Sequence, residues 1–204
     1  MTMTAGPIAW LRERLGTLRH YHQVAEVGEI ARRYFAMNAF DGVLTTLGVL
    51  AGGYLADVDS ARAIVSVGLA AAIAMGVSGF YGSYLVERAE RDRSLRELEE
   101  ATLSKLDHSD IASASTYASI VIALVDGLSP FVAAVIVLVP FFLDGVIAVH
   151  NAYFVAAAIA FIELFLLGVF LGRVSRQRLV WSGVKLIAAG VVCLALSVLL
   201  DWGL

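Results

Sequence analysis

The composition of this 204-residue chain excludes an ordinary water-soluble fold. Apolar residues make up 59% of it and charged residues 16%, and the mean hydropathy is +0.80. These values lie well outside the range of soluble domains. The net charge of −3 says little, and the single cysteine, Cys193, excludes both an intrachain disulfide and a thiolate metal cluster. We therefore expect an all-α integral membrane protein.

Five long apolar runs follow one another along the chain. Each is long enough to cross about 30 Å of hydrocarbon at about 1.5 Å per helical residue. The third run contains Pro130, and we expect a tilt or kink there rather than two spans, because no polar loop interrupts it. The runs are residues 34–56, 61–86, 111–143, 150–172 and 179–200.

Basic residues alternate between the loops and set the expected orientation. They cluster before the first span, between spans two and three, and between spans four and five, whereas the other side has only Arg62. Basic loops stay in the cytosol. The pattern therefore predicts a cytosolic N-terminus and a C-terminus outside or in a lumen, with the first span directing insertion because no cleavable signal peptide precedes it.

The same pattern divides the chain into four parts. Residues 1–33 form a cytosolic amphipathic segment, which either lies on the membrane surface or packs on the bundle. Residues 34–86 hold spans one and two, residues 87–110 form a short charged cytosolic helical hinge, and residues 111–204 hold spans three to five. We expect no nucleic-acid partner and no permanently bound cofactor.

Three acids within the spans are the first candidates for function: Asp41, Asp126 and Glu163. A charge in the membrane costs roughly 2.5–3.5 kcal/mol on insertion scales, so such residues usually face the bundle interior. A bound cation is the simplest way to neutralise them, and protonation is the second. Lys185 offers a structural alternative, since it can pair with Glu163 or extend to the interface.

Oxygen ligands accompany the first of these acids. Asn38, Asp41 and Thr45 follow one another at helical spacing, which predicts an amide, a carboxylate and a hydroxyl along one face. Oxygen donors suit hard divalent cations, and the thioether of Met75 in span two would favour softer iron. Met75 in the lipid-facing surface or in the core remains the alternative.

Span two also has a stripe of small residues, which predicts close helix packing or dimerisation. The stripe comprises Gly68, Ala72, Gly76, Gly79 and Gly82. Residues 40–45 and residues 125–130 show a weak sequence similarity, since each segment has an aspartate followed by a glycine in an apolar run. Internal repeats of this kind occur in transporters.

The run of residues 32–52 resembles the first-helix signature of the vacuolar iron transporter family. It contains Asn38-Ala39-Phe40-Asp41-Gly42, then a Thr-Leu-Gly run, and it closes on Ala-Gly. The five spans with a charged insertion after the second are also similar to that family. One departure is that Gly79-Phe80-Tyr81 stands where the family has Gly-Glu-Tyr, so the glutamate is missing and Met75 is one residue out of register.

The resemblance implies a homodimer that moves ferrous iron or manganese out of the cytosol in exchange for protons. It implies that Asp41 is the pathway aspartate and Met75 the pathway methionine. It also implies a cytosolic metal module, carried over to the hinge acids Glu87, Glu90, Glu97 and Glu100 because their spacing fits one helical face. A solvated, salt-bridged helix explains the same acids, and it is the interpretation that their pattern alone favours.

The leading interpretation is thus a metal–proton exchanger in which Asp41, Asn38, Thr45 and Met75 hold the ion while Asp126 or Glu163 carries the proton. A membrane scaffold with structural acids is the second interpretation. A proton-coupled carrier of a small organic cation is the third, kept open by aromatic residues near Asp41. No nucleotide-binding glycine loop, zinc-protease motif or nucleophile with a base is present, so we expect no enzyme activity.

Overall fold

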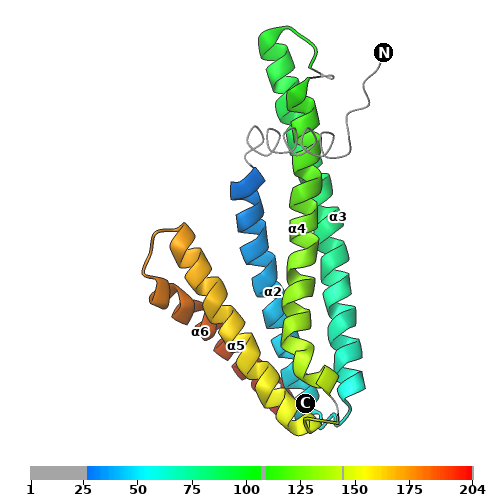
Figure 1. Cartoon of the computed structure of the whole chain (residues 1–204), viewed down its shortest axis with the longest axis vertical. Coiled ribbons are helices and arrows are strands. Elements are labelled where there is room, and N and C mark those ends of the chain that lie inside the picture. Colours follow the sequence, from blue (N-terminus) through cyan, green and yellow to red (C-terminus); the bar gives the residue numbers. More distant parts are fainter. Residues whose placement is uncertain (1–26, 107–108, 144, 204) are drawn as a thin grey trace, which may run out of the picture.

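The computed structural model describes residues 27–106, 109–143 and 145–203, and it is all-helical in those ranges. The elements run in the order α2 (Val27–Leu55), α3 (Ala61–Thr102), α4 (Asp110–Leu138), the 3-10 helix η1 (Val139–Leu143), α5 (Val149–Val174) and α6 (Leu179–Trp202). Figure 1 shows them as long, nearly unbroken rods. The expected N-terminal amphipathic segment falls almost entirely outside the described residues.

Five helices are long and apolar enough to cross a membrane, which confirms the predicted number of spans. Their limits agree with the apolar runs to within a few residues except at α2, which begins seven residues early, and α3, which extends beyond its run. The third span is continuous through Pro130 and ends in η1, so it is one crossing and not two. The chain is therefore a multi-pass membrane protein.

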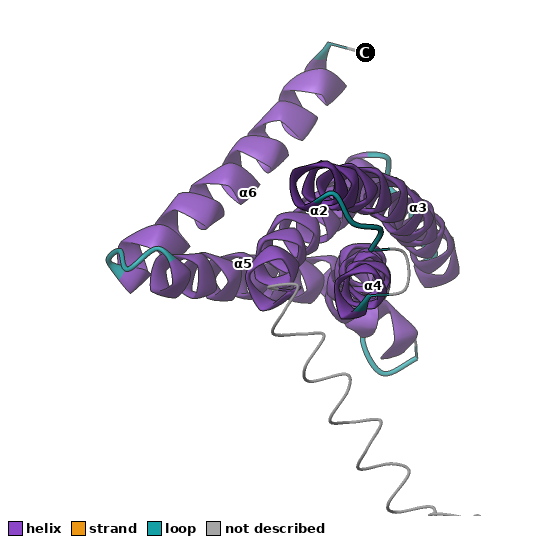
Figure 2. Cartoon of the chain, turned by 90° about the horizontal axis from the view of Figure 1, so that it is seen from above, coloured by secondary structure: helices purple, strands orange, loops and turns teal. Residues whose placement is uncertain are grey.

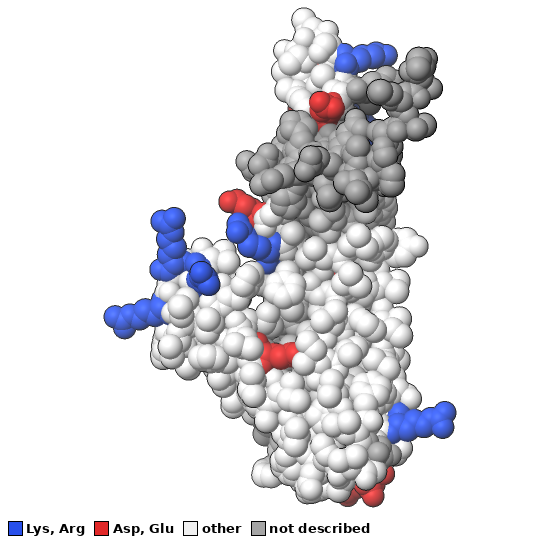
Figure 3. Space-filling view, viewed as in Figure 1, with Lys and Arg blue, Asp and Glu red and all other residues white. Residues whose placement is uncertain are grey.

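Many large apolar side chains lie on the outside of the helices. Val67, Ile73 and Val77 of α3 and Val191 and Val192 of α6 are each more than half exposed. In water this would be a large patch prone to aggregation, but a bilayer solvates it. Figure 3 shows the same arrangement on one face, where charged side chains gather mainly toward the ends and the middle is largely uncharged.

Helices α2, α3 and α4 form a three-helix bundle in which α4 packs against both others. Helices α5 and α6 form an antiparallel hairpin that contacts α2, and α5 also touches α4. Seen along the bundle, the hairpin extends to one side (Figure 2). In Figure 1 it meets the bundle at the end where the C-terminus lies and diverges from it toward the other end.

Glycines allow α4 to approach its neighbours closely. A Cβ atom on Gly42 of α2 would lie 2.5 Å from the carbonyl oxygen of Pro130, and one on Gly76 of α3 would lie 2.8 Å from that of Gly127. Neither space admits a methyl group, so only glycine permits these contacts. The small-residue stripe of span two thus serves packing on α4, except at Gly82, where a Cβ would meet nothing within 4 Å.

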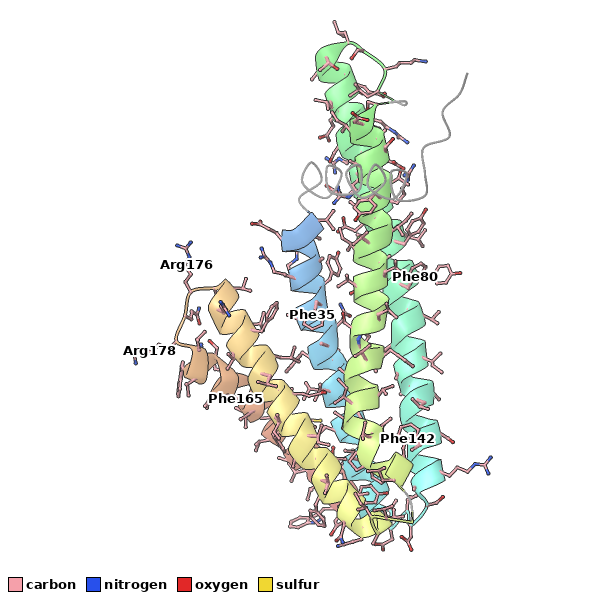
Figure 4. All side chains as sticks on the ribbon, in the orientation of Figure 1. Phe35, Phe80, Phe142, Phe165, Arg176 and Arg178 are labelled. Carbon is pink, nitrogen blue, oxygen red and sulfur yellow. The ribbon has the colours of Figure 1, made fainter. Side chains whose placement is uncertain are left out.

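Helix α3 is longer than a membrane is thick. Its 42 residues span about 63 Å, about twice the hydrocarbon core. Ser60 caps its start by accepting a hydrogen bond from the Ala63 amide, and Leu103 ends it in the left-handed conformation. The predicted hinge is therefore mostly the continuation of span two. We call the end of the molecule with this extension and the α5–α6 turn the basic end; Arg176 and Arg178 extend outward there (Figure 4).

Candidate functional site

Polar side chains from three helices meet inside the bundle. The Asn38 side-chain amide of α2 donates a hydrogen bond to the carboxylate of Asp126 on α4. The Ser83 hydroxyl of α3 donates to the Gly79 carbonyl at 2.7 Å and lies close to that carboxylate. Asp126 is only 5% exposed, and Ser83 is likewise 5% exposed. A buried carboxylate needs such partners, so Asp126 is held in a defined position between α2, α3 and α4.

The cluster continues toward the basic end. The Tyr34 hydroxyl of α2 lies within reach of the Glu87 carboxylate of α3, and Glu87 forms an ion pair with Arg91 at 3.4 Å. Glu87 is 9% exposed, the most buried of the hinge acids. We call Tyr34, Asn38, Ser83, Glu87 and Asp126 the polar cluster. The cluster places polar side chains at successive depths between the basic end and the middle of the bundle.

Asp41 lies next to this cluster but points elsewhere. Its side chain and that of Thr45 are exposed on α2, whereas Asn38 is turned toward α4. The carboxylates of Asp41 and Asp126 are still close enough to interact electrostatically. The prediction that Asn38, Asp41 and Thr45 share one face is therefore wrong. The Asn38 amide hydrogen-bonds Asp126, whereas Asp41 and Thr45 lie exposed on the outside of α2.

Asp41 and Met75 lie at the same depth in the membrane. Each lies 14 residues from the end of its helix at the turn that joins α2 and α3. That distance is about 21 Å along the helix axis, inside a hydrocarbon core of about 30 Å. Met75 is half-buried on α3. Asp41 and Met75, the two pathway residues that the resemblance implies, thus lie at the same depth on neighbouring helices.

Glu163 of α5 has a different environment. It lines a cavity of about 270 Å³ between α5 and the α2–α4 pair, and its buried Oε2 has no hydrogen-bond partner. The expected alternative of an ion pair with Lys185 is not formed, since Lys185 is exposed on α6 and neither residue makes a salt bridge. Asp126 and Glu163 are therefore separate sites, one satisfied and one not.

The hinge acids make ion pairs along a solvated helix. The Arg93 guanidinium donates to Glu97 at 2.9 Å, which raises the pKa of Arg93, and Arg88 pairs with Asp92 at 3.1 Å. Glu90, Glu97 and Glu100 are exposed, unlike Glu87. Across the ranges that the structure describes, no three acidic, histidine or cysteine side chains come together to hold a metal ion within one chain.

Spacing did not assign Ser83 and Arg91 to a site, and the sequence indicated Tyr34 only as one of the aromatic residues near Asp41. A signal was available, because Gly79, Ser83 and Glu87 follow at four-residue intervals and so share one face of a helix. A serine and a glutamate on the glycine-bearing face of an apolar span indicate that this face is the buried one. Arg91 follows Glu87 by four residues on the same helix, so spacing also allowed that pair. Tyr34 depends on a contact between α2 and α3, which spacing does not reveal.

No family model matches the chain, and no solved structure matches it. Over 177 residues the chain is 31% identical to the uncharacterized protein MJ0645 of the archaeon Methanocaldococcus jannaschii, a match that covers 85% of this chain and 90% of that protein. The chain belongs to the same family as this archaeal protein. That relative's name states no activity, so the functional argument rests on the residues described above.

Proposed function

We propose that this protein moves a divalent metal ion, ferrous iron or manganese, through the membrane in exchange for protons. The observation that carries the proposal is the position of Asp41, a carboxylate exposed on a membrane-spanning helix and about 21 Å from the nearer turn. Exposure of the Asp41 carboxylate to lipid would cost roughly 2.5–3.5 kcal/mol on insertion scales. A polar pathway that carries a cation removes this cost.

A second copy of the chain is the simplest cover for that face. Gly48 and Gly52 of α2 and Gly82 of α3 have open space where a Cβ would stand, and Thr45 and Ser78 are exposed beside them. Small residues with hydroxyl groups favour close contact between membrane helices. A homodimer through this face would place two Asp41 carboxylates and two Met75 thioethers at one depth, which supplies more ligands than one chain offers.

The cargo route follows from this arrangement. An ion entering from the basic end would pass Glu87 and reach Asp41, Thr45 and Met75 at the proposed dimer face, where oxygen and sulfur donors replace its water shell. Asp126, held by Asn38 and Ser83 next to that face, is the acid placed to carry the counter-moving proton. Glu163 lies apart from this route. Positive charge at the basic end favours a cytosolic position for that end, and export is the direction that the resemblance to the vacuolar iron transporter family implies.

The transport test uses the full chain reconstituted in vesicles. Ferrous iron or manganese flux is measured with and without a proton gradient for wild type, Asp41→Asn and Asp201→Asn. Asp201 is the matched control because it is an exposed acid in the last turn of α6. We expect gradient-dependent flux that falls at least tenfold in Asp41→Asn and is unchanged in Asp201→Asn. Absence of metal flux in a folded wild-type sample would refute the proposal.

The dimer is tested separately by cysteine cross-linking. In a Cys193→Ser background, Thr45→Cys should form a disulfide-linked dimer in membranes, because two copies of this face would meet near their common axis. Val192→Cys is the control, since Val192 is 55% exposed on α6, away from the proposed face. Equal cross-linking at both positions, or none at Thr45→Cys with flux intact, would remove the dimer from the proposal.

A further inference from the structure

The cavity between α5 and the α2–α4 pair combines apolar walls with one acid. Phe35 and Ala39 come from α2, Ile136 from α4, and Leu166 and Phe170 from α5. The rings of Phe35 and Phe170 meet edge to face with centroids 5.8 Å apart. In Figure 4, Phe35 lies on the upper half of α2, from which α5 diverges. The cavity is thus an aromatic-edged groove within the membrane.

Glu163 is the only acid that lines this groove, and the described residues around it provide no positive charge. The other polar lining residue is Ser129, whose hydroxyl donates to the Val125 carbonyl within its own helix. Lys185 is exposed on α6 and does not pair with Glu163. A buried carboxyl oxygen without a partner forgoes its hydrogen bonds. The Glu163 carboxyl group therefore has a free position for a cationic hydrogen-bond donor that enters the groove.

The chemistry of the groove favours an organic cation over a metal ion. Metal ions such as magnesium, calcium and manganese need several oxygen ligands, and here one carboxyl group faces aliphatic and aromatic carbon. An ammonium group satisfies a carboxylate with a single charge-assisted hydrogen bond, and an attached apolar body fills the remaining space. A cavity of about 270 Å³ suits an amine with one aromatic ring.

We propose that this groove binds a small amphiphilic amine, with its ammonium group on Glu163 and its apolar body between Phe35, Phe170 and Leu166. The groove lies between α5 and the α2–α4 pair, and the α5–α6 hairpin diverges from the bundle toward the basic end (Figure 1). The site is separate from Asp41 and from the polar cluster. It is therefore independent of metal transport and is a property of the α5–α6 hairpin docking against the bundle.

The test measures binding of radiolabelled phenethylamine to the purified full chain in detergent, with 2-phenylethanol as a neutral competitor of nearly the same shape. We expect saturable binding that unlabelled phenethylamine displaces and that 2-phenylethanol displaces at least tenfold more weakly. Equal competition by the alcohol would mean that the groove recognises only apolar surface, and absence of saturable binding would refute the site. This comparison uses wild type alone and so does not depend on a variant folding.

Variants then locate the site. Glu163→Gln keeps the shape of the side chain and should weaken phenethylamine binding at least tenfold, while Lys185→Gln, which removes an exposed charge on the neighbouring helix, should leave it unchanged. Phe170→Leu should weaken binding of phenethylamine, and 2-phenylethanol should remain the weaker competitor in this variant. Wild-type affinity in Glu163→Gln would place the amine elsewhere and overturn the proposal.

Discussion

The contact between α2 and α4 at Gly42 allows a sharp test of the fold. In Gly42→Ala the new Cβ would lie 2.5 Å from the carbonyl oxygen and 2.6 Å from the Cα of Pro130. Both are backbone atoms, so neither can rotate away as a side chain would. The two helices would have to separate by roughly 1 Å to restore an ordinary van der Waals distance.

The expected cost follows from that separation. Overpacking of a close contact costs about 1–3 kcal/mol, and moving α2 away from α4 also stretches the hydrogen bond from Asn38 to Asp126 one turn away, which adds about 1 kcal/mol. For a chain of this size, 1 kcal/mol corresponds to about 2–4 °C in melting temperature. Alanine is favoured over glycine in a helix by about 1 kcal/mol, which leaves a net loss of about 1–3 kcal/mol. We therefore expect Gly42→Ala to melt about 2–12 °C below wild type.

Gly48→Ala is the matched control on the same helix. A Cβ there would meet nothing within 4 Å, and alanine is favoured over glycine in a helix by about 1 kcal/mol. Its melting temperature should equal or slightly exceed that of wild type. The assay heats each variant in detergent and measures the folded fraction by size exclusion, using the monomeric peak because Gly48 lies on the proposed dimer face. If Gly42→Ala melted with wild type, the close α2–α4 contact would be wrong.

Three further predictions concern single interactions. Asn38→Leu leaves the Asp126 carboxyl without its amide donor and should lower the free energy of unfolding by about 1–3 kcal/mol. Adding Asp126→Leu to this variant should recover most of the loss. Thermal denaturation of the two single variants and the double variant measures the coupling. Tyr153→Phe removes a 2.8 Å hydrogen bond to a carbonyl in the α2–α3 turn and should lower the melting temperature by a few degrees through a loss of about 1 kcal/mol, while an unchanged value would show that water replaces it. Arg93→Ala and Glu97→Ala break an exposed ion pair, so each should leave the melting temperature unchanged at both low and high salt, and a salt-dependent loss would contradict that expectation.

The spans could be predicted from sequence because lipid acts on each helix separately. An apolar run of bilayer length must cross as a helix wherever its neighbours lie. The sequence located the end of the apolar part of α3 near Val86, yet the helix continues to Thr102. The reason is local: residues 84–102 contain no glycine or proline, and ion pairs between arginines and acidic residues at i, i+4 spacing support the helix in water.

The candidate site was predictable only in part, because helix rotation decides which residues meet. Spacing correctly pointed to Asp126 as an acid within the membrane, and it grouped Asn38 with Asp41 on one face. Three residues advance about 300° around a helix, so these two side chains differ by about 60° in direction. That difference is enough to turn Asn38 toward α4 and leave Asp41 outside. No sequence pattern in a single chain fixes this rotation.

The two Asp-Gly motifs show what one chain leaves incomplete. In both, the glycine makes the close helix contact, Gly42 against Pro130 and Gly127 against Gly76, and the preceding aspartate is carried to the flank of that contact. The flank of Asp126 is covered by α2 and α3, which supply Asn38 and Ser83. The equivalent flank of Asp41 has no covering helix in the described chain. Neighbouring helices provide hydrogen-bond partners for the aspartate in one copy of the motif, whereas Asp41 remains exposed. The second copy of the chain that we propose would cover Asp41 through the small residues that line this face.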